Sequence, residues 1–206
     1  KSRAELEMAV KEDVGCIVVD NFYEIALLEE ITEQYQKKMP VLLRLTPGIE
    51  AHTHDYILTG QEDSKFGFDL QNGQADEAVR LVQNSKGLEL LGIHCHIGSQ
   101  IFETTGFIMA TQKLFAKMKE WKQRIKFVPQ VLNLGGGFGI RYTEEDHPIP
   151  VSQYVEVIIE EVKKQSKQLE VEIPEIWIEP GRSLVGDAGT TLYSIGSRKH
   201  VPNVRE

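Results

Sequence analysis

The chain has 206 residues, of which 41% are hydrophobic and 26% are charged, a composition typical of a globular protein. Its formal net charge of −8 argues against partners such as nucleic acid or an anionic membrane surface. No apolar run approaches the roughly 20 residues that span a bilayer. The two cysteines, Cys16 and Cys95, lie in separate apolar runs, which favours free thiols and a cytoplasmic location.

The chain begins with "KSRAELEMAV", which is charged and helical in pattern, so no signal peptide is expected. We expect this segment to lie inside a helix without a cap signal. Short β-branched or apolar runs then alternate with longer amphipathic segments. The runs predict strands within 15–20, 40–48, 91–99, 131–137 and 175–183, and the amphipathic segments predict helices within 21–38, 72–85, 107–125 and 151–169.

Strands that are apolar on both faces and separated by helices are typical of a buried parallel sheet. Five such units predict an α/β fold, a parallel (β/α)8 TIM-type barrel that is incomplete in this chain. A doubly wound sheet remains an alternative. We expect residues 1–186 to form the partial barrel. The β-branched segment "TTLYSIGSRKH" then predicts a strand, so residues 187–206 would connect to a C-terminal β domain that this chain lacks.

Unusual residues follow three predicted strands, at the end where βα barrels place their active sites. In "LNLGGGFGI", the consecutive Gly135, Gly136 and Gly137 favour a phosphate-binding turn, although a plain tight turn is the alternative. The spacing is not the dinucleotide fingerprint, because Ile140 stands where its last glycine belongs. In "WIEPGRSL", Pro180 and Gly181 predict a turn after Glu179 that presents Arg182, a residue suited to carboxylate or phosphate; a structural Glu–Arg pair is the alternative.

The segment "GIHCHIGSQI" places His94 and His96 on one face of a strand and Cys95 on the other. Two such histidines, with a second pair at His52 and His54, suit a metal-dependent hydrolase. Later strands end in glycines and EPGR rather than in further ligands, which argues against a metal. His94 lies deeper in the strand and is predicted to be a core residue.

Together these three motifs resemble the fold-type III pyridoxal-phosphate-dependent decarboxylases, and "RLTPGIEAHTHDYILTGQEDSKFGF" supports the resemblance along the rest of the chain. Gln100 and the HTH loop are more similar to the branch that acts on diaminopimelate than to the ornithine or arginine branches. The resemblance implies pyridoxal 5'-phosphate as cofactor and decarboxylation of meso-2,6-diaminopimelate to L-lysine, the last step of lysine biosynthesis. It also implies a homodimeric full-length enzyme.

The resemblance also implies roles for individual residues. His96 would stack on the pyridine ring and Ser99 would lie near the phosphate. Glu179 would pair with the ring nitrogen, and Arg182 would also hold a substrate carboxylate. The phosphate would sit between two turns, which comprise Gly135, Gly136 and Gly137 in one and Pro180, Gly181 and Arg182 in the other.

No lysine of this chain lies in the motif that carries the family's Schiff-base lysine, and Lys65 is expected to be structural. The first barrel strands and most of the second domain are expected to be missing as well, so this chain alone should be inactive. Alternatives are a related decarboxylase acting on ornithine, arginine or carboxynorspermidine, the metal-dependent hydrolase, and a non-catalytic pyridoxal-phosphate-binding protein.

Overall fold

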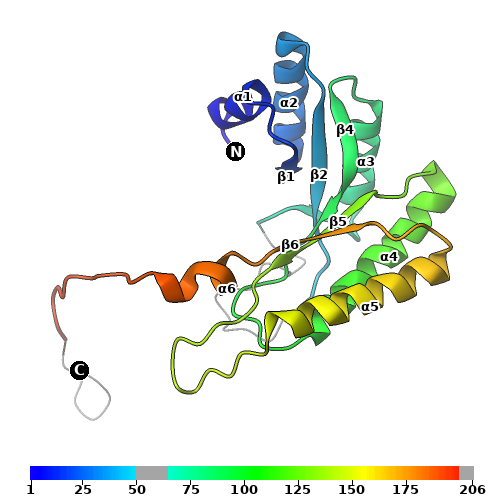
Figure 1. Cartoon of the computed structure of the whole chain (residues 1–206). Coiled ribbons are helices and arrows are strands. Elements are labelled where there is room, and N and C mark those ends of the chain that lie inside the picture. Colours follow the sequence, from blue (N-terminus) through cyan, green and yellow to red (C-terminus); the bar gives the residue numbers. More distant parts are fainter. Residues whose placement is uncertain (50–64, 200–206) are drawn as a thin grey trace.

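The structure, a computed structural model, describes residues 1–49 and 65–199 and contains a parallel sheet with helices between its strands (Figure 1). All five predicted strands are present. The main path of the sheet runs in chain order through β1 (Ile17–Val19), β2 (Met39–Thr46), β4 (Leu88–His94), β5 (Val131–Gly136) and β6 (Glu175–Glu179). A doubly wound sheet reverses its strand order at a switch point. The sequential order therefore favours the incomplete barrel and removes the alternative.

One strand was not predicted. β3 (Phe68–Asp69) pairs in parallel with the end of β2, Leu45 opposite Phe68 and Thr46 opposite Asp69. Two residues are too few to produce a periodic pattern, so this strand depends on its neighbour rather than on a local signal.

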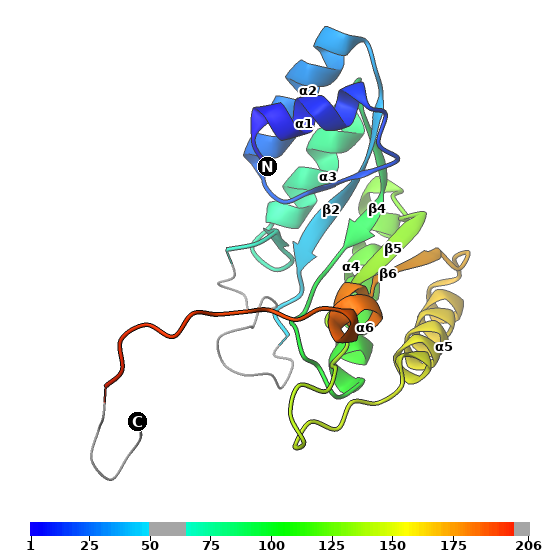
Figure 2. The same ribbon diagram turned by 60° about the vertical axis from the view of Figure 1, so that its left-hand side comes forward.

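The four predicted internal helices are also confirmed. They are α2 (Phe22–Tyr35), α3 (Gln74–Asn84), α4 (Thr105–Ile125) and α5 (Val151–Leu169). α4 and α5 lie side by side (Figures 1 and 2). The apolar stripe of α4 includes Phe107, Leu114 and Met118, which are at most 1% exposed. Among the described helices, none is both long and apolar enough to cross a membrane.

The first helix corrects one expectation. α1 (Arg3–Lys11) has a complete capping box, in which the Ser2 hydroxyl accepts from the backbone N–H of Glu5 and the Glu5 carboxylate accepts from the backbone N–H of Ser2. The Ser-x-x-Glu spacing that produces this cap is present in the sequence. The expectation of an uncapped helix overlooked it because the apolar periodicity begins only at Leu6.

Strand register separates the two faces of the sheet. Leu43, Ile93 and Leu132 pair across β2, β4 and β5 and are fully buried. The next residues along these strands, Arg44, His94 and Asn133, also pair with one another. Because neighbouring side chains on a strand alternate between faces, an apolar row packs into the core and a polar row lies on the opposite face, near the carboxyl ends of the strands.

The segment after the sheet departs from its prediction. Beyond α6 (Gly181–Val185) and a 3-10 turn (Gly186–Ala188), residues 189–199 extend away from the sheet without forming a strand (Figures 1 and 2). Leu192, Tyr193 and Ile195 are each at least 84% exposed. A strand needs a neighbour for its N–H and C=O groups, and no described segment pairs with this one.

Candidate functional site

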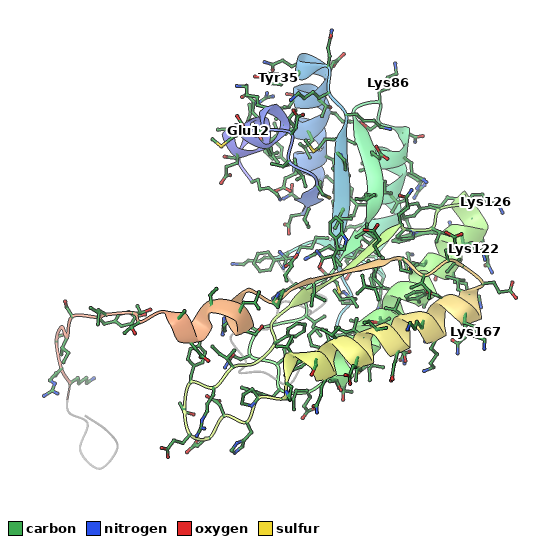
Figure 3. All side chains as sticks on the ribbon, in the orientation of Figure 1. Glu12, Tyr35, Lys86, Lys122, Lys126 and Lys167 are labelled. Atoms are coloured by element: carbon green, nitrogen blue, oxygen red, sulfur yellow. The ribbon has the colours of Figure 1, made fainter. Side chains whose placement is uncertain are left out.

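The three motifs found in the sequence meet at one edge of the sheet. His94 ends β4, Gly136 ends β5 and Glu179 ends β6, and these strands are parallel neighbours. The opposite end of the sheet, where helices finish and strands begin, carries the residues labelled Tyr35, Lys86 and Lys126 in Figure 3. The structure therefore confirms that the strand-end motifs are adjacent in space.

Glu179 is held by two side chains from the inner strands. Its Oε1 lies 3.1 Å from Nε2 of His94 and accepts a hydrogen bond from Nδ2 of Asn133 at 3.0 Å. The contact with His94, opposed by partial burial, keeps the pKa of the Glu179 carboxyl below its usual range. His94 is 4% exposed, which confirms the predicted core position, but its contact with Glu179 was not predicted. The site therefore holds a carboxylate at neutral pH.

The glycine turn needs glycine for two reasons. Gly135 and Gly137 have φ angles of 69° and 87°, a region that favours glycine. A Cβ on Gly136 would lie 2.0 Å from the carbonyl oxygen of Glu179, and one on Gly137 would lie 2.1 Å from that of Gly98. The pairing of β5 with β6 also shifts register between Asn133 and Gly136. The turn is therefore fixed by close backbone approach as well as by conformation.

His96 and Ser99 lie beside this turn. β4 ends at His94, so His96 lies just beyond the strand on which it was expected. Nδ1 of His96 accepts a hydrogen bond from the backbone N–H of Gly136 at 3.4 Å, and burial lowers the pKa of the imidazole. Cα of Ser99 is 3.3 Å from the position that a Cβ on Gly137 would occupy. Cys95 is fully buried, and burial raises the pKa of its thiol to about 12. We conclude that His96 presents a neutral ring at the site, whereas Cys95 is an unreactive core residue.

The EPGR segment is placed differently from the glycine turn. Pro180 precedes α6, and its carbonyl accepts hydrogen bonds from the Leu184 backbone N–H and the Ser183 hydroxyl. Arg182 is exposed, with its guanidinium 5.8 Å from the centre of the Tyr142 ring. The structure brings Glu179 to the glycine turn but does not bring Arg182 into contact with it.

Sequence reasoning missed several residues of this site. A cavity of roughly 360 Å³ is lined by Lys1, Val18, Asp20, Arg44, His94, His96 and Glu179. Nη1 of Arg44 lies 3.5 Å from Oδ1 of Asp20, while Asn133 contacts Glu179 from the neighbouring strand. A charged residue inside the apolar run "PVLLRL" and an amide before "LGGG" were the signals that could have identified Arg44 and Asn133.

The polar side chains of the site can be tested against two possible ligands, a metal ion and pyridoxal phosphate. Across residues 1–49 and 65–199, no cluster of three His, Cys, Asp or Glu side chains could hold a metal ion; His52 and His54 lie outside the described residues. A carboxylate beside a neutral imidazole, next to a turn without side chains, suits a flat ring with a protonated nitrogen. The residues present therefore fit the pyridine ring of pyridoxal phosphate.

Two of the backbone N–H groups of the glycine turn have partners within the chain. The backbone N–H of Gly135 donates to Oδ1 of Asn133 at 2.9 Å, and that of Gly136 donates to His96. These two N–H groups are already used within the chain. The phosphate site between the two glycine-containing turns stays a prediction.

Sequence comparisons find relatives that match the whole chain. A diaminopimelate decarboxylase from Bacillus methanolicus is 70% identical over 205 residues, covering 100% of this chain and 48% of that protein. One from Bacillus subtilis is 63% identical, with 100% and 47% covered. The chain thus spans about half the length of the curated relatives it matches.

Solved structures show the same likeness. The diaminopimelate decarboxylase from M. jannaschii matches 89% of this chain and 42% of that chain, with a TM-score of 0.80 and 32% identity. The one from Helicobacter pylori, described as complexed with L-lysine, matches 89% and 44%, with a TM-score of 0.75 and 30% identity. Residues 1–186 match the family described as pyridoxal-dependent decarboxylase, pyridoxal binding domain. The chain therefore belongs to the pyridoxal-dependent decarboxylases and carries their pyridoxal-binding domain.

Proposed function

We propose that this chain is the cofactor-binding part of an enzyme that decarboxylates meso-2,6-diaminopimelate to L-lysine. The observation that carries the proposal is the meeting of Glu179, His96 and the Gly135–Gly137 turn at adjacent strand ends. The names of the relatives at 70% and 63% identity favour diaminopimelate as the substrate. The solved relative complexed with L-lysine is consistent with the expected product.

The side chains at the strand ends have distinct tasks in this proposal. Pyridoxal phosphate, when bound, supplies an electron sink for the electron pair left on the α-carbon after carbon dioxide departs. The Glu179 carboxylate would hold a proton on the pyridine nitrogen, because a neighbouring negative charge favours the protonated ring. His96 would lie against the face of the ring and orient it. The turn of Gly135, Gly136 and Gly137 would hold the phosphate, with Ser99 beside it.

The role of Arg182 depends on the family resemblance. We propose that it holds a substrate carboxylate, since a guanidinium forms bidentate bonds with such groups. In the structure it lies over the Tyr142 ring and is exposed. Pro180, Gly181 and the backbone of Arg182 would close the phosphate site from the other side, as the family resemblance implies.

We further propose a cytoplasmic homodimer for the full-length enzyme, as the family resemblance implies. Cys16 and Cys95 are both free thiols in the described residues, which is consistent with a reducing compartment. Light scattering of the purified full-length protein would give twice the monomer mass; a monomeric mass at assay concentration would contradict the dimer.

A substrate comparison tests the proposed reaction. The full-length protein that contains this chain would be assayed for carbon dioxide release from meso-diaminopimelate, ornithine, arginine and carboxynorspermidine, with and without added pyridoxal phosphate. Cofactor-dependent release from meso-diaminopimelate, with L-lysine as product, is expected. Preference for another substrate would assign a different decarboxylase, and cofactor binding without release from any of them would indicate a non-catalytic binding protein.

The isolated 206-residue chain provides the control for this assay. We expect no carbon dioxide release above that of the free cofactor, because none of its lysines lies in the motif of the family's Schiff-base lysine. Turnover by the isolated chain would show that one of its own lysines, with Lys65 tested first, performs that role.

A further inference from the structure

The geometry points to a function for two residues that no motif identified: His94 and Asn133 are positioning residues that fix one oxygen of Glu179 and turn the other toward the cofactor's pyridine nitrogen. This inference rests on the proposed function for the identity of the ring. The arrangement of the three side chains follows from the structure itself.

Glu179 needs support because of its position. It ends β6, which pairs with β5 alone among the described strands, and its side chain is 49% exposed. His94 and Asn133 come from the inner strands β4 and β5, pair in register and are 4% and 5% exposed. Both contact Oε1 of Glu179, at 3.1 and 3.0 Å. Two rigid donors therefore hold an otherwise half-exposed carboxylate by a single oxygen.

The orientation of Asn133 is set by its second hydrogen bond. Its Oδ1 accepts from the backbone N–H of Gly135 at 2.9 Å. This bond identifies the amide oxygen, so the NH₂ group must be the one that faces Glu179. Asn133 consequently joins the glycine turn to the carboxylate.

The surroundings of His94 determine which nitrogen carries its proton. Nδ1 is buried and has no hydrogen-bond partner among the described residues. A proton on Nδ1 would be a buried, unpaired donor, which is unfavourable. The tautomer protonated at Nε2 avoids that cost and donates to Glu179. His94 is therefore a hydrogen-bond donor to the carboxylate in this arrangement.

Three other polar side chains, His96, Arg44 and Asp20, line the same cavity as Glu179. Arg44 and Asp20 contact each other, and His96 accepts a hydrogen bond from the backbone N–H of Gly136. The hydrogen bonds to Glu179 itself come from His94 and Asn133. Together they keep the pKa of its carboxyl low, with His94 making the larger contribution.

The test measures the ionisation of Glu179 without cofactor, in the full-length protein containing this chain. Glutamate would be labelled with ¹³C at its side-chain carboxyl, and the Glu179 signal assigned by its loss in Glu179→Gln. His94→Leu should shift the titration midpoint of Glu179 upward, because the donor is lost. His94→Gln, which restores a side-chain N–H, should bring the midpoint back toward that of the unchanged protein.

A matched control separates positioning from stability. Ile93→Val alters the adjacent, fully buried residue and should cost about 1 kcal/mol of stability without moving the Glu179 midpoint. Asn133→Ala removes the second donor and should also raise the midpoint, so it serves if His94→Leu fails to fold. An unchanged midpoint in folded His94→Leu, or in folded Asn133→Ala if that variant is needed, would overturn the inference.

A second measurement links the inference to the cofactor. His94→Leu should weaken pyridoxal phosphate binding by about tenfold, a change that corresponds to 1.4 kcal/mol, and His94→Gln should recover part of it. If the unchanged protein binds no pyridoxal phosphate, the proposed function fails, while the titration still decides whether His94 and Asn133 control Glu179. If it binds the cofactor but His94→Leu binds equally well, the positioning role fails and the proposed function stands.

Discussion

Two glycine-containing segments lie at the ends of the neighbouring strands β5 and β6, and they differ in how closely other backbone atoms approach their glycines. Gly136 and Gly137, at the end of β5, meet backbone atoms of adjacent segments so closely that a Cβ would lie 2.0 and 2.1 Å from a carbonyl oxygen. Gly181, after β6, has open space where a Cβ would be and begins a short exposed helix. The conformation of the segment after β5 is therefore fixed by close backbone packing against its neighbours. The segment after β6 has no such constraint within the described residues.

The largest effect is expected from Gly137→Ala. Its φ of 87° and the nearby carbonyl of Gly98 impose both backbone strain and a steric clash. We expect a loss of about 2–4 kcal/mol in the free energy of unfolding, measured by urea denaturation. A loss below about 0.5 kcal/mol would contradict the close approach of the Gly98 carbonyl to Gly137.

Glu179→Gln should affect chemistry more than folding. The amide keeps the shape of the side chain but loses the negative charge that would hold a proton on the pyridine nitrogen. We expect turnover of the full-length enzyme to fall by about tenfold or more, each tenfold corresponding to 1.36 kcal/mol of transition-state stabilisation. Cofactor affinity, measured by fluorescence titration, should change less. Equal turnover in both proteins would remove Glu179 from this role.

His96→Ala should weaken cofactor binding by severalfold to about tenfold, because a stacked ring contributes about 0.5–1.5 kcal/mol beyond the area it buries. Equilibrium dialysis against pyridoxal phosphate provides the measurement. His94→Ala should lower stability in addition to cofactor binding, since it leaves the buried contact with Glu179 unmade. Loss of a tightly bound metal from both variants would instead favour the metal-dependent hydrolase.

The stability contributed by Glu179, at the end of β6, should depend on pH. The pKa of Glu179 is lower in the folded chain than its ordinary value, chiefly through His94. Its contribution to stability is therefore complete above the unfolded-state pKa and is lost as pH falls through the folded-state pKa. Urea midpoints measured across the acidic range should decline less steeply in Glu179→Gln. Parallel declines would contradict the assigned shift.

The smallest effect is expected from Gly181→Ala. A Cβ at this position meets nothing within 4 Å, and the φ angle is not in the left-handed region. Replacing glycine by alanine at such a position changes stability by no more than about 1 kcal/mol, in the favourable direction. Urea denaturation beside Gly137→Ala gives the contrast directly. Strong destabilisation by Gly181→Ala would mean that the EPGR segment is constrained by contacts beyond the described residues.

The pattern of the chain was sufficient to predict five strands and four helices, because continuous apolar runs and apolar periods of 3.6 residues are local properties. The position of each motif after a strand also predicted that Glu179 and the glycine turn would meet, since parallel strands end at one edge of a sheet. The cap at Ser2 was equally readable but was overlooked. The strand expected after residue 189 is absent because pairing requires a neighbour, which a local pattern cannot supply.

The contacts within the site were decided by the tertiary structure alone. His94 meets Glu179 because β4, β5 and β6 are adjacent. Asn133 meets it because Asn133 pairs with Trp177, two residues before Glu179 on the same face of β6, and the pairing of β5 with β6 then shifts register. Such a shift depends on hydrogen bonds between strands that are distant in the sequence. The sequence by itself determined the type of fold, the cofactor class it resembles and the residues capable of chemistry. Strand order and register determined which of those residues touch, because they set the distances across which hydrogen bonds form.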